Sequence, residues 1–567
     1  MNENGHNLQR PWHRYYPETI RPSIDYPDIP LYQFADDAAK AFPDRAATIF
    51  FGARLSFKQL AVLIDRMAAA LHALGVQKGD RVGLMLPNCP QVLIAYHAVL
   101  KVGGVVVQTS PMYVEREIEH QMNDSGAQTM IVLDLFYQRV RNVKEKTPLK
   151  RVIVTGLEDF MPFPLNFLYP LKLRTEGKRV TVQPEEGVYR FMELLNRRQP
   201  APPQVAINPA EDLALLQYTG GTTGVAKGTM LTHRNLVANT IQSREWFELK
   251  RGGQDIILGA LPFFHVYGMT VGMNLAMLLG ATLIILPRFQ VTEVLKTIQK
   301  YHPTLFPGAP AMYVAINNHS DVKKYDLTSI VACISGSAPL PVEVQNKFEA
   351  LTGGKLVEGY GLTEASPVTH CSPIFGHRKI GTIGIPFPDT DCKIMDLATG
   401  ETELPQGEVG ELAIRGPQVM KGYWNRPEET KMALRDGWLY TGDIARMDED
   451  GFFQVVDRKK DLIISGGFNI YPRDVEEILY EHPKVREVVV AGVPDAYRGE
   501  MVKAYVVLKD GVTATEEELI EFCRERLARY KVPRAIEFRA ELPKNLVGKI
   551  LRRVLVDEER KKLEKLA

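Results

Sequence analysis

One short loop combines the residue types that bind phosphate. Residues 218–228 read YTGGTTGVAKG, with four glycines, three threonines and a lysine. Glycines let backbone N–H groups approach anionic oxygens, and the hydroxyls and the ammonium add further donors. The Walker P-loop pattern is not met, because Lys227 is followed by Gly228 rather than by Ser or Thr. The loop predicts a phosphate site of another kind, since a flexible linker would not need the hydroxyls and the lysine.

Further polar motifs follow this loop in a fixed order. They are PFFHVYG at 262–268, SGSAPL at 335–340, GYGLTE at 359–364, YTGD at 440–443, DRKKDLIISGGFNIYP at 457–472 and PKNLVGKI at 543–550. Together with the loop they resemble the adenylate-forming superfamily, which includes acyl-CoA synthetases, luciferases and the adenylation domains of peptide synthetases. The resemblance spans almost all of the chain after residue 30, with a minor departure at Ala226, where the family usually has Pro.

The resemblance implies how ATP and Mg²⁺ would be bound. Glu364 corresponds to the family's magnesium carboxylate, with Thr219 as a second metal ligand near the phosphates. Tyr360 would stack on the adenine, and Asp443 would accept both ribose hydroxyls. The expected nucleotide-binding residues are Thr219, Gly220, Gly221, Thr222, Thr223, Gly224, Gly336, Ser337, Ala338, Glu358, Gly359, Tyr360, Gly361, Thr363, Asp443 and Arg458.

Adenylation brings a carboxylate against the α-phosphate of ATP, so cations must offset the repulsion between two anions. The resemblance assigns this chemistry to Lys549, Lys227, Glu364 and the carboxylate-orienting His265. It also implies a second conformation for thioester formation. A small domain would rotate about the hinge residue Lys460 and bring Ser465, Gly466 and Gly467 to a tunnel for the pantetheine of CoA.

The acyl pocket is expected in the uncharged stretch that begins at Val266, Tyr267 and Gly268. Relatives that activate amino acids carry an Asp soon after the position of His265, and this chain has none there. A substrate amine would leave its charge unpaired in an apolar site, at a cost of several kcal/mol. The acid is therefore expected to be apolar.

Residues 436–460 resemble the fatty acyl-CoA synthetase signature, with departures at Tyr440, Ala445 and Met447. The wider sequence is most similar to bacterial long-chain-fatty-acid–CoA ligases. This implies that a long-chain fatty acid and ATP form an acyl-adenylate, which CoA converts to acyl-CoA with release of AMP and pyrophosphate. The chain ends soon after Lys549, so a diffusible acceptor is expected. Three alternatives stay open: a medium-chain ligase, an aryl-acid ligase, and a fatty acyl-AMP ligase serving a carrier protein.

Short apolar runs alternate with amphipathic helical stretches through most of the chain, which predicts an α/β fold with largely parallel sheets. The expected fold is a large N-terminal adenylate-forming domain of stacked α/β sheets with a small C-terminal α+β lid. The expected boundaries are a loose leader at 1–30, the AMP- and acyl-binding domain at 31–456, a hinge at 457–460 and the lid at 461–567.

Bulk composition restricts the partners. The chain has 69 basic and 68 acidic residues, a balance that gives no electrostatic reason to expect nucleic acid. Its five scattered cysteines favour free thiols in a reducing compartment and make a zinc site improbable.

No Asp, Glu, Lys or Arg occurs from Ile256 to Pro287, but Pro and Gly interrupt this stretch. We expect it to form two buried strands around a helix inside a cytoplasmic protein, and any membrane contact to be peripheral.

Residues 157–200 interrupt the α/β pattern with MPFPLNFLYPLKLR and a polar stretch after it. A surface excursion packed on the domain is the favoured interpretation. The alternative is an apolar lip near a membrane that collects a lipid-like substrate. The prolines argue against a regular amphipathic helix there. The oligomeric state has no signal in the sequence.

Overall fold

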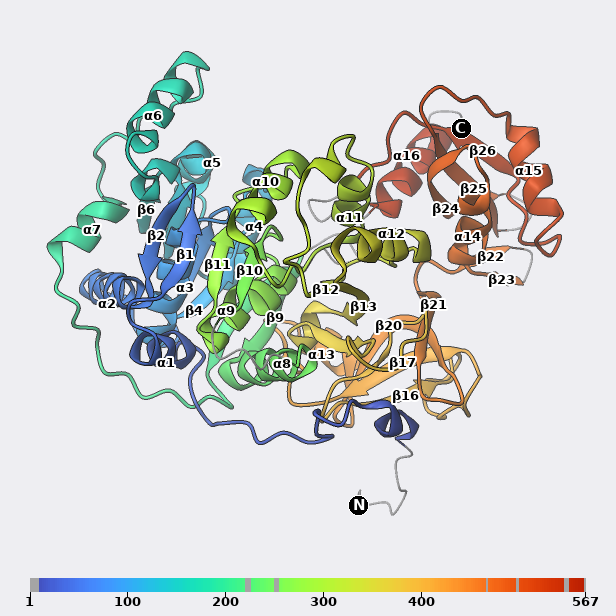
Figure 1. Ribbon diagram of the computed structural model, residues 1–567, viewed down its shortest axis with the longest axis horizontal. Coiled ribbons are helices and arrows are strands. Elements are labelled where there is room, and N and C mark those ends of the chain that lie inside the picture. Colours follow the sequence, from blue (N-terminus) through green and yellow to red (C-terminus); the bar gives the residue numbers. More distant parts are fainter. Residues whose placement is uncertain are drawn as a thin grey trace. The chain divides into compact units, whose positions relative to one another are not determined.

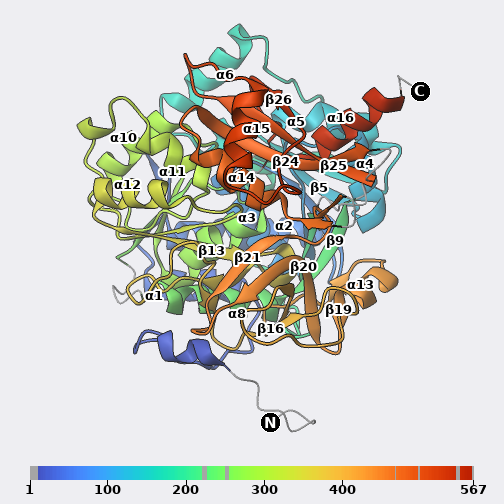
Figure 2. The same cartoon turned by 90° about the vertical axis from the view of Figure 1, so that its right-hand side faces the viewer.

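The computed structural model describes residues 10–219, 226–248, 254–465, 468–495, 499–544 and 550–564. Its contacts group the chain into two compact units (Figures 1 and 2). The first unit comprises residues 12–391 and 415–439, and the second comprises 392–414 and the described part of 440–567, with residues 10–11. The expected α/β class, with a large N-terminal and a small C-terminal domain, is confirmed.

The largest sheet lies in the first unit and has eight strands. They are β3 (Arg81–Met85), β4 (Val105–Gln108), β5 (Thr129–Leu133), β6 (Arg151–Thr155), β7 (Val188–Arg190), β8 (Leu213–Thr219), β9 (Lys227–Thr232) and β18 (Gly422–Tyr423). Their order is β18-β9-β8-β4-β3-β5-β6-β7. The strands from β8 to β7 in this order are parallel, as the apolar runs predicted, whereas β9 and β18 are antiparallel additions at one edge.

The first unit also contains two smaller sheets. One consists of β1 (Ala46–Phe50), β2 (Ala53–Ser56), β10 (Ile256–Gly259) and β11 (Thr282–Ile285) in the order β10-β11-β1-β2. The other has the order β12-β13-β14-β15, formed by β12 (Ala332–Ser335), β13 (Lys355–Gly361), β14 (Val368–Cys371) and β15 (Ile385–Pro386).

The uncharged stretch at 256–287 folds as expected, with the buried strands β10 and β11 at its ends. Between them lie a π-helix, η3 (Gly268–Asn274), and α9 (Leu275–Leu279), most of whose side chains are buried. The π-helical turn was not predicted from the sequence. Of the helices in the described ranges, none is both long and apolar enough to cross a membrane.

Helices cover the sheets of the first unit. They are α1 (Gln33–Ala41), α2 (Phe57–Ala73), α3 (Pro90–Lys101), α4 (Glu115–Ser125), α5 (Asp134–Lys144), α6 (Leu165–Thr175), α7 (Phe191–Arg197), α8 (His233–Trp246), α10 (Val291–Tyr301), α11 (Pro310–Asn317), α12 (Val342–Thr352) and α13 (Pro427–Ala433), with short 3₁₀ turns at η2 (Leu157–Phe160) and η5 (Thr363–Ala365). Two begin with a capping box, at Ser56 for α2 and at Thr232 for α8, which satisfies N–H groups that lack helical partners. Every residue of α3 is buried, consistent with its apolar sequence.

Two expectations for this unit are wrong. Residues 12–30 of the expected leader at 1–30 are not loose, because Trp12 and Ile20 are buried and the Tyr16 hydroxyl donates to the Pro386 carbonyl at 2.7 Å. The prolines at 162–170 do not prevent a helix, since α6 forms with Pro170 inside it. Pro164 precedes α6, where its missing N–H costs nothing.

The second unit contains a sheet with the path β16-β17-β20-β19 and β21 paired to β20. These strands are β16 (Asp391–Met395), β17 (Gly410–Arg415), β20 (Trp438–Met447), β21 (Phe453–Arg458) and, from the first unit, β19 (Leu434–Arg435).

The C-terminal sheet of this unit consists of β22 (Ile463–Ser465), β23 (Phe468–Ile470), β24 (Val485–Asp495), β25 (Gly499–Leu508) and β26 (Ala535–Phe538), with the helices α14 (Pro472–Glu481), α15 (Glu516–Arg524) and α16 (Arg552–Glu564) (Figure 2). Leu479, Leu519 and Val506 belong to a core that joins α14 and α15 to the sheet.

All five cysteines are free and buried. Burial raises the pKa of Cys89 to about 12 and that of Cys523 to about 11.

One ion cluster ties the first three helices together. Nζ of Lys101, at the end of α3, lies 2.7 Å from Oδ1 of Asp36 on α1 and 2.5 Å from Oδ1 of Asp65 on α2. The Lys101 side chain is only 10% exposed. Burial raises the pKa of Asp36, although Lys101 acts in the opposite direction.

Lys101→Met is expected to lower the free energy of unfolding by about 3 kcal/mol, because it leaves two half-buried carboxylates without their cation. Urea denaturation followed by circular dichroism measures the change. Lys40→Met is the matched control, since Lys40 is 76% exposed and pairs with Asp37 at the surface. Equal stability of the two variants would contradict a structural role for the cluster.

Candidate functional site

A β-hairpin holds the two ends of the glycine- and threonine-rich loop. β8 ends at Thr219 and β9 begins at Lys227, and these two residues are direct partners in the antiparallel ladder. The predicted phosphate-binding residues between them, Gly220, Gly221, Thr222, Thr223 and Gly224, lie outside the described residues. The hairpin therefore places the ends of the loop at the edge of the largest sheet.

Two residues that sequence reasoning missed contact Lys227, and one of them, Tyr423, also contacts Glu364. Lys227 forms an ion pair with Glu429 on α13, and its Nζ lies 5.3 Å from the ring centroid of Tyr423. The Tyr423 hydroxyl donates to Oε1 of Glu364 at 2.8 Å. Burial and the nearby Glu364 raise the pKa of Tyr423, so its hydroxyl stays protonated and acts as the donor. The only signal was the segment GYWNRPEET at 422–430, which no general rule links to phosphate binding.

The segment 417–424 is fixed along β9 by backbone and side-chain hydrogen bonds. β18 pairs with β9, with Tyr423 opposite Thr229. Nδ2 of Asn235 donates to the carbonyls of Pro417 and Val419, both at 2.8 Å. The Met420 N–H donates to the Glu364 carbonyl at 2.8 Å. These bonds bring Glu364 and Tyr423 together although 59 positions separate them.

A side-chain hydrogen bond joins the two segments predicted to enclose adenine. Gly336, Ser337 and Ala338 follow β12, whereas Glu358, Gly359, Tyr360 and Gly361 end β13. The Leu340 N–H donates to Oε2 of Glu358 at 3.0 Å, and Thr363 with Glu364 forms the next turn, η5. The Tyr360 ring packs edge-on against His370, with centroids 5.7 Å apart. A Cβ at Gly336 would approach the Tyr267 ring to 3.0 Å, so a small residue is needed there.

The predicted acyl-site residues lie at the start of η3. His265 is half-buried, and its Nδ1 accepts from the Tyr267 N–H at 3.3 Å. Val266, Tyr267 and Gly268 are buried, and the Tyr267 hydroxyl donates to the Ile334 carbonyl at 2.7 Å. A Cβ on Gly268 would lie 2.4 Å from the Pro262 carbonyl, so this position requires glycine.

The turn before His265 is positioned by amides from two strands of the large sheet. Asn88, which follows β3, accepts from the Phe263 N–H at 2.7 Å and donates to the Leu261 carbonyl at 2.7 Å. Gln217 on β8 donates to the Phe264 carbonyl at 3.1 Å. Sequence reasoning missed both amides, because neither belongs to a motif. Gln217 thus links the phosphate hairpin to the His265 turn, and Asn88 links the end of β3 to it.

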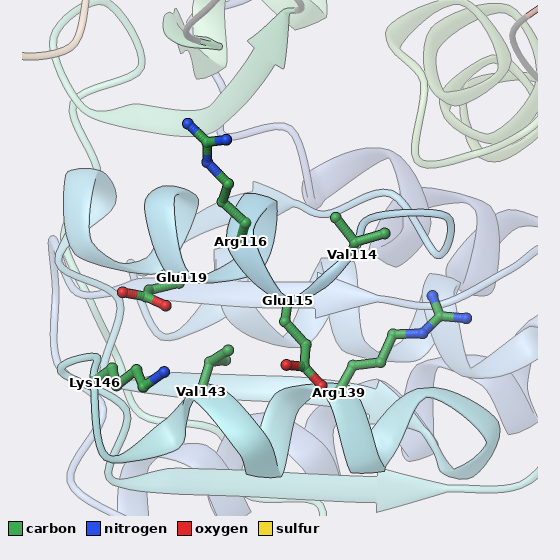
Figure 3. A pocket seen from close by; sticks show the side chains of 7 residues that line it. All are labelled: Val114, Glu115, Arg116, Glu119, Arg139, Val143 and Lys146. Atoms are coloured by element: carbon green, nitrogen blue, oxygen red, sulfur yellow. The ribbon is translucent and has the colours of Figure 1, made fainter.

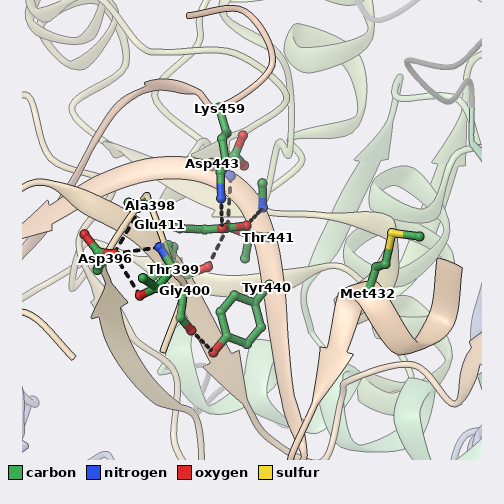
Figure 4. Close-up of polar contacts among 12 residues, drawn as sticks. Asp396, Ala398, Thr399, Gly400, Glu411, Met432, Tyr440, Thr441, Asp443 and Lys459 are labelled. Atoms are coloured by element: carbon green, nitrogen blue, oxygen red, sulfur yellow. Dashed lines mark hydrogen bonds and ion pairs between the residues drawn. The ribbon is translucent and has the colours of Figure 1, made fainter. Parts of the chain in front are cut away.

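In the second unit, a buried carboxylate organises the predicted ribose site (Figure 4). Asp443 on β20 is opposite Arg458 on β21, and Arg458 Nε lies 3.5 Å from Asp443 Oδ1. Glu411 on β17 accepts from the Gly442 N–H at 3.0 Å and from Lys459 Nζ at 2.8 Å. Glu411 was not predicted, although it fixes both segments that carry the predicted residues.

Tyr440, one of the departures from the fatty acid signature, has a partner of its own. Its hydroxyl donates to the Gly400 carbonyl at 2.8 Å, as Figure 4 shows. The neighbouring Thr441 hydroxyl donates to the Leu412 carbonyl at 2.8 Å. Both bonds fix the backbone that leads to Asp443.

The residues predicted for the hinge and the CoA tunnel are described only in part. Lys460 is exposed after β21, and Ser465 is buried at the end of β22. Gly466, Gly467 and Lys549 lie outside the described residues. Arg552, at the start of α16, bonds to Asp461 at 2.6 Å and to Glu476 at 2.8 Å, and lies 3.8 Å from Asp457. Burial raises the pKa of Asp457 to about 6, although Arg552 acts in the opposite direction.

A wide hollow of about 570 Å³ lies elsewhere, between α4 and α5 (Figure 3). It is lined by Val114, Glu115, Arg116, Glu119, Arg139, Val143 and Lys146. None of the predicted site residues contributes to this open, mixed-charge surface. Within the described ranges, no group of three or more His, Cys, Asp or Glu side chains could hold a metal ion.

Comparison with known proteins identifies the family. The model for AMP-binding enzymes matches residues 35–424, and the model for the C-terminal domain of AMP-binding enzymes matches residues 474–549. A long-chain-fatty-acid–CoA ligase of Bacillus subtilis (strain 168) is 51% identical over 554 residues, covering 97% of this chain and 98% of that protein.

Two solved structures have the same fold. ATP-bound MatB from Rhodopseudomonas palustris gives a TM-score of 0.81 at 29% identity, covering 94% of this chain and 99% of MatB. The anthranilate–CoA ligase AuaEII in complex with anthranoyl-AMP gives a TM-score of 0.83 at 25% identity, covering 95% and 98%. With a family model spanning most of its length and a relative half identical along nearly all of it, the chain belongs to the AMP-binding enzyme family.

Proposed function

We propose that this protein joins a long-chain fatty acid to CoA, using ATP and passing through an acyl-adenylate. The observation that carries the proposal is the buried stretch after His265, which has no charged side chain from Ile256 to Pro287. If the acid carried a second charged group far from its carboxylate, that group would have no charged partner in this stretch. The Bacillus subtilis relative supports the chain length, and the acyl-AMP bound to AuaEII supports the intermediate.

The first step needs positive charge where two anions meet. Lys227 lies at the end of the phosphate loop, and Glu364 with Thr219 supplies the oxygen ligands that Mg²⁺ prefers. When bound, Mg²⁺ would offset the charge of the phosphates. Tyr423 holds Glu364 in place through its hydroxyl, so we assign it a positioning role. Lys549 would contact the carboxylate and the α-phosphate.

The second step needs the pyrophosphate site to open and the thiol to enter. Lys460 is the proposed hinge, and Ser465, Gly466 and Gly467 are proposed to line the pantetheine path. Asp443 and Arg458 would hold the ribose through both steps, with Glu411 keeping their strands in register. Since ATP and CoA are the co-substrates, we expect the protein to act in the cytoplasm, with peripheral contact to the membrane that holds its lipid substrate.

The purified protein, given ATP, Mg²⁺ and fatty acids of increasing length, should form thioester only with CoA and best with long chains. AMP release and thioester formation measure the two steps. Lys549→Ala should abolish adenylate formation but spare thioester formation from supplied acyl-adenylate, with Lys561→Ala as the control. Adenylate without thioester would instead indicate a carrier-protein acceptor, and activity restricted to aryl or medium-chain acids would refute the long-chain assignment.

Glu411→Gln is expected to raise the KM for ATP roughly tenfold with a small change in kcat, because a charged hydrogen bond that fixes the ribose-binding strands is lost. Steady-state kinetics at varied ATP give both constants. Glu408→Gln, at an exposed position just before β17, is the control. A folded variant with an unchanged KM for ATP would show that Glu411 does not position this site.

Tyr423→Phe removes the hydroxyl that holds Glu364 and nothing else. We expect the Mg²⁺ concentration for half-maximal adenylation to rise by about tenfold, corresponding to one hydrogen bond to a charged group. Tyr16→Phe is the control, because it loses a hydroxyl bond of similar length to Pro386. If both variants need the same Mg²⁺ as the unaltered protein, Glu364 is either not the metal ligand or not positioned by Tyr423.

A further inference from the structure

Helix α6 is an outlying element of the first unit. It packs on the neighbouring turn η2 and buries one large side chain, Leu173. Figure 1 shows it projecting beyond α5 and β6. Its sequence, LNFLYPLKLRT, is more apolar than an exposed helix requires.

Large apolar side chains cover the outer face of this segment. Phe163 is 85% exposed and Phe167 is 66% exposed, and Leu165, Leu168 and Leu171 are exposed with them. At 3.6 residues per turn, Phe167, Leu168 and Leu171 fall within an arc of about 100°, opposite the buried Leu173. Single exposed apolar residues are ordinary, but a contiguous group of this kind indicates a contact surface.

Basic side chains border this apolar face. Residues 161–179 contain Lys172, Arg174, Lys178 and Arg179, and Glu176 is their only acidic residue. Glu176 lies 2.9 Å from Lys178 and 3.8 Å from Lys172, so the border keeps an excess of positive charge. An apolar face with a cationic border is complementary to the surface of an anionic bilayer.

The length of α6 fixes the depth of contact. Eleven residues with a proline inside cannot cross a bilayer. A helix of this kind can lie in the interface, with its apolar side chains among the upper parts of the acyl chains and its cations at the headgroups.

We propose that residues 163–179, the α6 patch, dock this protein on an anionic lipid bilayer. Phe163, Phe167, Leu168 and Leu171 enter the interface, and the four basic residues contact lipid phosphates. Docking does not depend on catalysis. Given the proposed function, it would bring the enzyme to the phase in which long-chain fatty acids accumulate.

Sedimentation with vesicles tests this proposal without ATP or CoA. The full chain should bind vesicles of phosphatidylcholine mixed with anionic phosphatidylglycerol, and more weakly those of phosphatidylcholine alone. The triple variant Phe163→Ser/Phe167→Ser/Leu171→Ser should bind these vesicles at least about tenfold more weakly than the unaltered protein. Replacing the four basic residues by Gln should remove the preference for anionic vesicles and its salt dependence. Phe51→Ser, at a 49% exposed phenylalanine outside the patch, should bind like the unaltered protein.

Three results would overturn the proposal: no binding of the unaltered protein to either vesicle, unchanged binding of the triple variant, or an equal loss with Phe51→Ser. Sedimentation equilibrium tests whether a second copy of the chain covers the patch instead. If the unaltered protein is a dimer that binds no vesicles, and the triple variant is a monomer, the patch is a dimer interface. Thioester formation from oleate supplied on serum albumin, with no vesicles present, should be unchanged in the triple variant. Its absence in every protein would count against the proposed function alone.

Discussion

The pairing of β9 with the segment 417–424 holds together most of the candidate site in the first unit. β9 begins at Lys227, and the paired segment supplies Tyr423 and the N–H of Met420, both of which bond to Glu364. Each hydrogen bond contributes only about 1 kcal/mol net. Their common attachment to one eight-stranded sheet makes them cooperative, because none can shift without disturbing the ladder. The two ends of the phosphate loop, Thr219 and Lys227, are therefore held at fixed points.

In the second unit, a buried carboxylate rather than a strand pairing holds the site segments together. Glu411 is buried, and its two oxygens bond to a backbone N–H on β20 and to a lysine that follows β21. A carboxylate in such a position is stable only when both oxygens are satisfied. In both units the residues nearest the expected chemistry are thus oriented by groups outside the motifs.

The parts of the fold that sequence predicted are those determined by local pattern. β3, β4 and β5 follow from uninterrupted apolar runs, and β10 and β11 from the uncharged stretch between 256 and 287. The motifs pointed to Thr219, Lys227, Glu364, Asp443 and Arg458. The structure pairs Thr219 with Lys227, links Lys227 to Glu364 through Tyr423, and pairs Asp443 with Arg458.

What sequence reasoning missed depends on contacts between distant positions. Tyr423 bonds to a residue 59 positions away, and Asn88 to one 175 positions away, so neither carries a local signal. The segment at 12–30 is held in the same way, because Tyr16 bonds to Pro386, 370 positions away. In α6 the local sequence was misleading in the opposite direction. Its prolines argued against a regular helix, yet the helix forms and Leu173 is buried.

The burial of every cysteine has a consequence for an enzyme that handles activated acyl groups. An acyl-adenylate reacts with any accessible thiolate, and the thiolate is the reactive form of cysteine. Burial raises the pKa of Cys89 to about 12 and also raises the pKa of Cys333, Cys371 and Cys523, so these thiols stay protonated at neutral pH. No cysteine thiol lies at the surface of the protein, so none competes there with an external thiol for the intermediate.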